Sequence, residues 1–359
     1  MKLLKYGLEF IKIVIFILAF CVIFVQLTYL YRGDIGNVRR NMCGFYAEEE
    51  DSLDVVILGT SSTFSSYMPF EAWNEYGYTS YNMCTNVLFV ETIKYYVREL
   101  QKTQHPKVLV IDISPFIFEH RADMFREQPS ILRYNTDGMS VSLNRFELVH
   151  EIIPKGERTE FYFDLLFYHN NEPDVSFMYN KKFNQRKGYA NLPIQVTFDE
   201  SQYIDPVIVA EPEECVKQEL LELLEELKTY DGEILFIEQP AFYTEETSYQ
   251  AGCALYVQNT VQSYGYDFLN MAEHRQEMGI DPRVDYSLDY LHFNANSARK
   301  ITHFLGNYLV TNYELPDHRG DLEYDRQWAD EYQIWFILLS EHISETDAQA
   351  EQILTVETN

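Results

Sequence analysis

Residues 55–58, Val-Val-Ile-Leu, form a continuous apolar run that ends at Gly59. A strand that is apolar on both faces is typical of the interior of a parallel sheet, where helices cover both sides. Gly59 permits a tight turn, and Thr60, Ser61 and Ser62 follow it directly. The sequence therefore predicts a buried parallel strand whose carboxyl end presents a serine at a turn.

Further apolar runs alternate with segments of helical spacing along the chain. Strands are predicted at residues 108–113, 234–237 and 266–269, and helices at residues 69–76, 90–101, 212–227, 245–264 and 294–309. Strands that alternate with helices indicate an α/β fold with a mostly parallel sheet. Reactive groups in such sheets gather at the carboxyl ends of the strands, which is where Ser61 is predicted to lie.

The N-terminus contains a run from Ile13 to Tyr31 without a charged residue. About 20 apolar residues cross the core of a bilayer as a helix, and Tyr29 and Tyr31 stand where an interfacial aromatic belt would lie. A cleaved signal peptide needs a shorter apolar core and a small-x-small cleavage site, which the sequence lacks. An uncleaved single-pass anchor is therefore favoured. Basic residues on both sides of the run leave its orientation open.

The chain divides by composition into an anchor, a body and an extension. We expect a transmembrane anchor at residues 1–32, a polar linker at 33–53, an α/β domain at 54–318 and a helical C-terminal extension at 319–359. Residues 119–205 show no strand–helix rhythm and are interpreted as an insertion or cap. The apolar patch at residues 334–339 is too short to span a membrane.

Charge and cysteine content exclude several classes of protein. The 359 residues carry a formal net charge of −28, which argues against nucleic-acid binding and against a polyanionic substrate. Such a charge suits a soluble, self-repelling ectodomain. The five cysteines show no metal-binding spacing, and the sequence leaves open whether any form disulfides. We expect no metal and no cofactor.

A second informative segment is Asp-Tyr-Leu-His-Phe-Asn at residues 289–294. It places Asp289 three residues before His292, just ahead of a predicted helix. With Ser61 as nucleophile, His292 as general base and Asp289 as the group that orients the imidazole, the chain contains a complete Ser-His-Asp set. Ser62 is the rival nucleophile. An ordinary strand-to-helix turn at Ser61 and a packing role for His292 are the alternatives, and the pairing of the two segments favours chemistry.

This pattern resembles the SGNH/GDSL hydrolase superfamily. More narrowly, it is similar to the membrane-anchored SGNH-like proteins of Gram-positive bacteria and, distantly, to the D-alanine-transfer protein of teichoic-acid D-alanylation. The matching segments are residues 55–69, 81–84, 106–113, 289–300 and 315–319. The resemblance implies a three-layer α/β/α sandwich with Ser61, His292 and Asp289 as its catalytic residues.

The chain departs from the family pattern around the oxyanion site. Thr60 replaces the aspartate before the nucleophile, Cys84 replaces the usual oxyanion-hole glycine, and Ser114 stands where a Gly-x-Asn-Asp block would begin. Cys84 can still donate its backbone N–H, and the amide of Asn86 could replace the missing asparagine, although Asn86 also suits an ordinary turn. Cys84, Asn86 and Ser62 are thus the candidate oxyanion and substrate residues.

The resemblance implies a serine esterase or O-acyltransferase on the outer face of the cell membrane. Its expected substrates are acyl groups, acetyl first among them, on a cell-surface polysaccharide, and the charge favours a neutral glycan. Transfer would require a membrane-bound O-acyltransferase partner to deliver the acyl group. The main alternative is a catalytically inactive SGNH-like protein that binds glycan or scaffolds a polysaccharide-modification or export complex. A lipid-directed hydrolase is a weaker alternative that rests on the apolar patch at 334–339.

Overall fold

The protein contains a five-stranded, wholly parallel sheet. The structure, a computed structural model, describes residues 2–33, 38–174 and 186–357. The strands follow the order β2–β1–β3–β4–β5, and each neighbouring pair is parallel. Their bounds are β1 (Val55–Gly59), β2 (Ser80–Cys84), β3 (Val108–Asp112), β4 (Glu233–Glu238) and β5 (Asp267–Asn270). The α/β fold with a parallel sheet that the sequence predicts is therefore confirmed.

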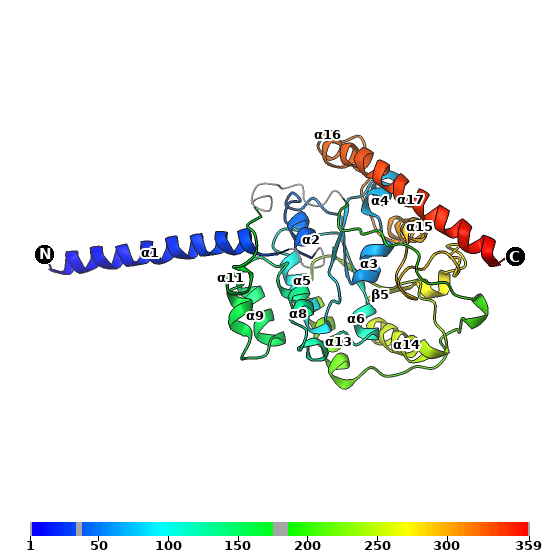
Figure 1. Ribbon diagram of the computed structural model, residues 1–359, viewed down its shortest axis with the longest axis horizontal. Helices are drawn as coiled ribbons and strands as arrows, with labels where there is room; N and C mark the ends of the chain where they lie inside the picture. Colours follow the sequence, from blue (N-terminus) through cyan, green and yellow to red (C-terminus); the bar gives the residue numbers. More distant parts are fainter. Residues whose placement is uncertain (1, 34–37, 175–185, 358–359) are drawn as a thin grey trace.

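Helices cover both faces of this sheet (Figure 1), because alternate strand residues point to opposite sides. Val56 and Leu58 share one apolar cluster with α2 (Val38–Phe45), α5 (Ile93–Leu100), α13 (Glu214–Leu227) and α14 (Ser248–Ser263). Val55 and Ile57 face a second cluster that includes α15 (Ala295–Asn312). Burial on both faces explains why β1 reads as an uninterrupted apolar run.

The strand order creates a switch point between β1 and β3. The chain leaves β1 for the edge strand β2 and then returns to form β3 on the other side of β1. Connections that diverge in this way leave a crevice at the carboxyl ends of the two central strands. The short helices α3 (Ser61–Ser66) and α6 (Ser114–Ile117) begin at this crevice.

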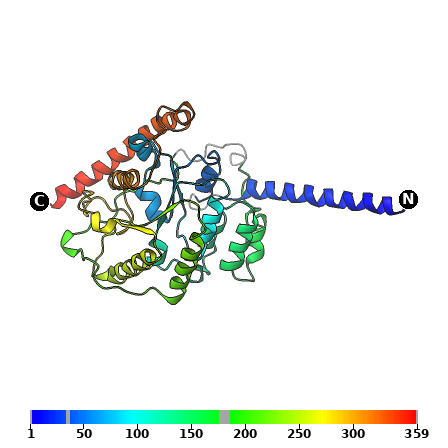
Figure 2. The same cartoon turned by 180° about the vertical axis from the view of Figure 1, so that it is seen from behind.

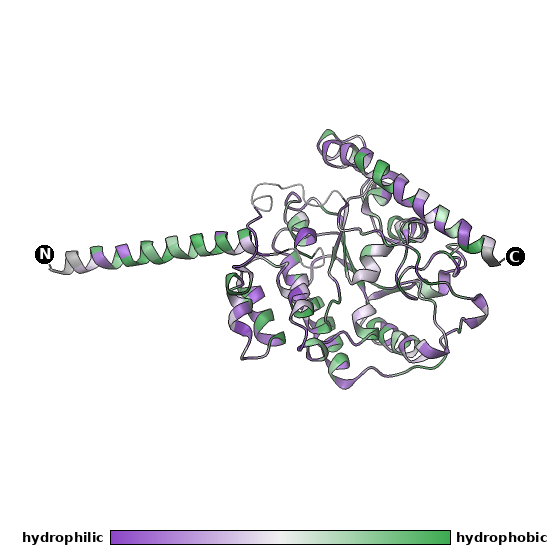
Figure 3. Ribbon diagram, viewed as in Figure 1, coloured by the Kyte–Doolittle hydropathy of each residue, from purple (hydrophilic) through white to green (hydrophobic). Residues whose placement is uncertain are grey.

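Helix α1 (Lys2–Tyr31) projects from the body, as Figures 1 and 2 show from opposite sides. Its segment Tyr6–Tyr31 reaches a mean hydropathy of 2.8 and is long and apolar enough to cross a membrane. The hydrophobic colour in Figure 3 runs along α1 to its junction with the body. Among residues 6–31 of α1, whose exposure the structure describes, partial cover by the body begins at Phe24.

The expectation of a polar linker at residues 33–53 is wrong for α2. Met42 and Phe45 of this helix are fully buried in the main apolar cluster. Val38, Met42 and Phe45 recur at helical spacing and form one apolar face. Because two arginines and an asparagine stand between these apolar residues, the overall composition of the segment is polar.

Within the described residues of the segment 119–205, short helices alternate with irregular stretches. It holds α7 (Ala122–Phe125), α8 (Pro129–Thr136), α9 (Leu143–Ile152), α10 (Arg158–Tyr162), α11 (Leu165–Tyr168) and the short turn η2 (Glu200–Gln202). Leu132 of α8 and Leu148 of α9 belong to the same apolar cluster as the sheet. This part of the chain therefore extends the main core.

The C-terminal segment is helical and returns to the body. It contains α16 (Leu322–Tyr324), η5 (Asp325–Ala329) and α17 (Asp330–Glu357). Trp328 and Trp335 are buried against α4 (Pro69–Tyr76), where their rings lie 5.3 Å from Trp73 and 6.1 Å from Phe70. The apolar patch at residues 334–339 is thus partly a packing surface for α4. The remaining short turns are η1 (Val90–Thr92), η3 (Glu245–Thr247) and η4 (Met271–His274).

Candidate active site

Ser61, His292 and Asp289 form one hydrogen-bonded series. The hydroxyl of Ser61 lies 2.8 Å from Nε2 of His292, and Nδ1 of His292 lies 2.8 Å from Oδ1 of Asp289. Ser61 is the first residue of α3, directly after β1, and the other two come from the loop before α15. The fold thus brings together the two sequence segments that supply the set.

The carboxylate of Asp289 is held in place by further hydrogen bonds while it contacts His292. Its Oδ1 also accepts backbone N–H groups from Leu291 at 2.8 Å and from His292 at 3.1 Å. Burial acts to raise the pKa of Asp289, but the hydrogen bonds with His292 and the backbone outweigh it and hold that pKa below its usual range. An ionised Asp289 accepts a hydrogen bond from Nδ1–H of His292, which leaves Nε2 able to accept a hydrogen bond from the Ser61 hydroxyl.

The loop that carries His292 is fixed at both ends. The carbonyl of His292 accepts the N–H of Ser287 at 2.8 Å. Asn294 then caps α15, and its side chain accepts the N–H groups of Asn296 at 3.0 Å and Ser297 at 3.3 Å. The Asp-x-x-His-x-Asn sequence therefore supplies both the Asp289–His292 pair and the residue that caps α15.

Under the serine turn lies a buried network centred on Asp112, at the end of β3. Its Oδ2 accepts hydroxyls from Thr63 at 2.6 Å, Ser114 at 2.7 Å and Ser62 at 3.1 Å. Burial raises the pKa of Asp112. The hydroxyl of Ser62, the rival nucleophile, lies in this network, whereas the hydroxyl of Ser61 faces His292. Ser114, at the expected third-block position, also serves this network.

Gly59 is required by the close packing of this turn. A Cβ at this position would lie 2.1 Å from Oγ1 of Thr63 and 2.9 Å from Cβ of Asp112. Any other residue would push the start of α3 away from β3. The absence of a side chain at Gly59 therefore allows α3 to start close to β3, which places Ser61 at the crevice.

Cys84 and Asn86 follow the neighbouring strand β2. The thiol of Cys84 donates to the carbonyl of Ile57 at 3.6 Å, and burial raises the pKa of this thiol well above its usual value. The side chain of Cys84 is therefore a buried neutral group that packs on β1. Asn86 stands in the following loop, next to Val87, whose φ of 51° is rare for a β-branched residue.

Asn135 of α8 fixes this strained loop. Its amide donates to the carbonyl of Val87 at 2.9 Å and its oxygen accepts the N–H of Phe89 at 2.9 Å. Strained backbone persists where the surroundings over-determine it, and such positions cluster at functional sites. The loop that carries Asn86 is thus held in one conformation beside the carboxyl end of β1.

Replacing Asn135 with alanine is expected to lower the free energy of unfolding by about 1–3 kcal/mol, because two buried backbone groups lose their partner. Chemical denaturation of the purified protein measures this change. Asn312→Ala is the control, since Asn312 is exposed and its amide donates only to the carbonyl of Tyr308 within α15. Equal midpoints for the two variants would contradict the proposed role of Asn135.

Sequence reasoning missed His120, a second histidine near the site. Burial and the nearby His292 lower the pKa of His120 to about 4, so its imidazole is neutral at neutral pH. The ring stacks on Phe118 at 5.7 Å, and Phe118 in turn lies 5.7 Å from Tyr290 of the His292 loop. No local pattern singles out His120, because it opens the irregular segment 119–205 and meets His292 only through the fold.

Glu238, at the carboxyl end of β4, is a further buried acid. Burial raises its pKa to about 8, and the Tyr243 hydroxyl donates to its carboxyl group. The unfolded chain releases this proton near 4.5, its usual value. Between these two pH values the folded state holds the proton more tightly than the unfolded state, so stability falls as pH rises.

Glu238→Gln is expected to remove this pH dependence of stability, because the neutral amide does not titrate. The amide oxygen can still accept a hydrogen bond from the Tyr243 hydroxyl. Wild type should lose up to about 1.4 kcal/mol of stability per pH unit relative to the variant between pH 5 and pH 8. Denaturant unfolding at a series of pH values measures the difference. Parallel pH profiles for the two proteins would show that Glu238 is ionised in the folded state.

The fold and the site together define a parallel α/β protein with a hydrogen-bonded Ser61–His292–Asp289 series next to the carboxyl end of β1. Among the described residues, no group of three or more His, Cys, Asp and Glu side chains is placed to hold a metal ion. No protein-family model matches the sequence, and no curated protein matches it. A crystal structure of a Lactobacillus plantarum protein is similar at a TM-score of 0.36 and 11% identity, over 73% of this chain and 99% of that one.

Proposed function

We propose that this protein is a membrane-anchored, SGNH-like serine esterase or O-acyltransferase. The observation that carries the proposal is the series of two 2.8 Å contacts from Ser61 through His292 to Asp289. A serine hydroxyl is a weak nucleophile until a neighbouring base accepts its proton. A base oriented by a carboxylate, at a switch point of a parallel sheet, meets that need.

In the proposed reaction, the Ser61 oxygen attacks the ester carbonyl while Nε2 of His292 takes the serine proton. The tetrahedral intermediate collapses when His292 returns this proton to the leaving alcohol, which gives an acyl-serine. Water or a glycan hydroxyl then attacks the acyl group while His292 accepts the proton of the attacking group. When this second intermediate collapses, the bond from the acyl carbon to the Ser61 oxygen breaks, His292 returns the proton to that oxygen, and the acid or acylated glycan leaves. Hydrolysis and transfer differ only in the acceptor at this second step.

Charge on the intermediate would be stabilised by backbone N–H groups near Ser61 and Cys84. The side-chain amide of Asn86 is proposed to take the place of the asparagine that the sequence lacks. One oxyanion donor contributes about 3–4 kcal/mol to the transition state. The strained conformation of Val87, fixed by Asn135, supports a defined position for this loop.

The wider assignment follows from the anchor and the charge. We propose a three-layer sandwich of the SGNH type with an inserted cap at residues 119–205, carried outside the cell by a single-pass α1. The substrate is proposed to be an acetylated neutral polysaccharide, because a net charge of −28 disfavours polyanions. For transfer, a membrane-bound O-acyltransferase would supply the acyl group.

The test is acetate release from, or acetyl transfer to, a neutral glycan by the full-length protein, with Ser61→Ala as the control. Activity that is lost in the variant supports the proposal, and equal activity in both proteins refutes it.

One observation favours a second candidate, a glycan-binding scaffold: Ser114 fills the third-block position and bonds to Asp112. A scaffold would keep its cellular function in both Ser61→Ala and His292→Ala.

A further inference from the structure

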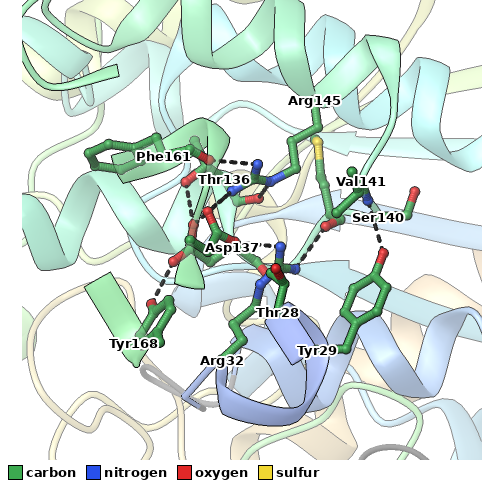
Figure 4. Close-up of polar contacts among 12 residues, drawn as sticks. Thr28, Tyr29, Arg32, Thr136, Asp137, Ser140, Val141, Arg145, Phe161 and Tyr168 are labelled. Carbon is green, nitrogen blue, oxygen red and sulfur yellow. Dashed lines mark hydrogen bonds and ion pairs between the residues drawn. The ribbon is translucent and has the colours of Figure 1, made fainter. Parts of the chain in front are cut away.

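The body is joined to α1 by a buried ionic cluster (Figure 4). Arg32, the residue after α1, is only 2% exposed, and its Nη2 lies 2.5 Å from Oδ2 of Asp164. Its Nη1 donates to the backbone carbonyls of Asp137 at 2.8 Å and Met139 at 3.1 Å. The first residue beyond the apolar helix is therefore locked into the segment that holds α8 to α11.

The same cluster binds these helices to one another. Asp137 pairs with Arg133 at 2.9 Å and with Arg145 at 3.2 Å, and Arg145 also reaches Asp164 at 2.8 Å. Burial acts to raise the pKa of Asp137, but the neighbouring guanidinium groups outweigh it and lower that pKa to about 2. These contacts join α8, α9 and the start of α11 to Arg32, so the helices follow the direction of α1 as one unit.

Contacts between α1 and this unit continue back into the apolar helix. The ring of Phe24 meets the ring of Phe163 edge-on at 5.8 Å, and the hydroxyl of Tyr29 accepts the N–H of Val141 at 3.0 Å. From Phe24 to Tyr31 an α-helix rises about 10 Å. The body therefore reaches alongside the last two turns of α1.

This overlap sets the height of the body relative to a membrane. Charged residues extend to Lys12, which pairs with Glu9 at 3.0 Å on the exposed surface of α1. The charge-free run from Ile13 to Tyr31 has about the length that a hydrocarbon core requires. Phe24 must then lie at lipid depth or in the interfacial layer, and Phe163, which touches it, lies at the same level.

The surface around Phe163 is apolar and exposed. We name it the seating patch, and its members with their exposed fractions are Val141 (46%), Leu143 (73%), Phe146 (50%), Phe163 (49%), Leu166 (53%) and Phe167 (43%). On the exposed side of α9, Leu143 and Phe146 lie toward Val141, and Glu147, His150 and Glu151 follow toward the far end. The apolar end is thus the end that adjoins α1.

We infer that the seating patch lies in the interfacial layer of the lipid bilayer, so that the body rests on the membrane in a fixed orientation. This inference depends on the proposed membrane anchoring by α1 and not on the chemistry at Ser61. Lipid is the occupant because the patch is continuous with the surface of α1 through Phe24 and Tyr29. Exposed aromatic and aliphatic groups at this depth are typical of interfacial contact.

The experiment uses tryptophan as a depth probe in the full-length protein, reconstituted in nanodiscs of brominated or ordinary phosphatidylcholine. The native tryptophans at 73, 328 and 335 are at most 2% exposed and give the baseline. Phe163→Trp and Leu166→Trp place a probe in the patch. Val207→Trp is the matched control, because Val207 is apolar and 81% exposed but lies on a loop outside the patch.

We expect brominated lipid to quench most of the emission added at positions 163 and 166 and none of that added at position 207. Because Leu166 is exposed, its variant stays informative even if Phe163→Trp disturbs the contact with Phe24. Emission at 163 and 166 that is as insensitive to brominated lipid as emission at 207 would overturn the inference. Contact with a protein partner in native membranes, without quenching in pure lipid, would equally overturn it in favour of a protein-binding surface.

Discussion

Ser61→Ala is expected to abolish both ester hydrolysis and labelling by a fluorophosphonate probe. The alanine removes the oxygen that attacks the substrate and leaves His292 and Asp289 in place. In established triads the loss of the nucleophile or of the base lowers turnover by about 10⁴–10⁶-fold, and what remains comes from binding and the oxyanion hole. His292→Ala should cost about as much, because the two residues act as a unit. Turnover of a small acetyl ester and gel-based labelling measure both effects.

Two neighbouring serines provide the controls for this experiment. Ser66→Ala removes a buried hydroxyl of the same short helix that donates only to the carbonyl of Thr63, and labelling should persist. Ser62→Ala tests the rival nucleophile: its hydroxyl bonds to Asp112 at 3.1 Å, so labelling should also persist. Loss of labelling in Ser62→Ala but not in Ser61→Ala would reverse the assignment. A folded wild type that never labels would favour the scaffold.

The parts of the fold that could be predicted are those whose sequence pattern is set by burial. β1 and β3 are apolar on both faces, so their runs read directly as interior strands. β2 could not be found in this way, because Ser80 and Asn82 are polar although they are fully buried. The amide of Asn82 donates to the carbonyl of Tyr67 at 2.8 Å, a partner that only the folded chain provides.

The site shows the same division between local and distant information. Asp289 and His292 could be paired from sequence because three residues separate them and a helix start follows. Asp112 and His120 could not be assigned, since their partners come from other segments: Thr63 for the first and His292 for the second. Likewise, Arg32 is one of the basic residues that flank the apolar run, yet it is buried against the Asp164 carboxylate and the backbone carbonyl of Asp137, both more than 100 residues away.

Asp164→Ala is expected to be the most destabilising single change outside the apolar core. Asp164 is 1% exposed and pairs with Arg32 at 2.5 Å and with Arg145 at 2.8 Å. Its removal leaves the cluster with three guanidinium groups facing Asp137 alone. Removing one partner of a buried ion pair typically costs about 3–5 kcal/mol, because the remaining charge stays dehydrated without compensation. Denaturant unfolding of the full-length protein, followed by tryptophan emission, measures the loss.

A double variant separates this cause from simple loss of packing. Arg32→Met combined with Asp164→Leu removes one charge of each sign, so the net charge of the cluster stays as in the wild type while apolar volume replaces the pair. Replacement of a buried ion pair by apolar residues is often nearly neutral, so the double variant should recover most of the stability that Asp164→Ala loses. Glu225→Ala, which breaks an exposed pair with Lys228, should leave the unfolding midpoint unchanged. If the double variant is no more stable than Asp164→Ala, the loss comes from packing and the cluster does not act through its charges.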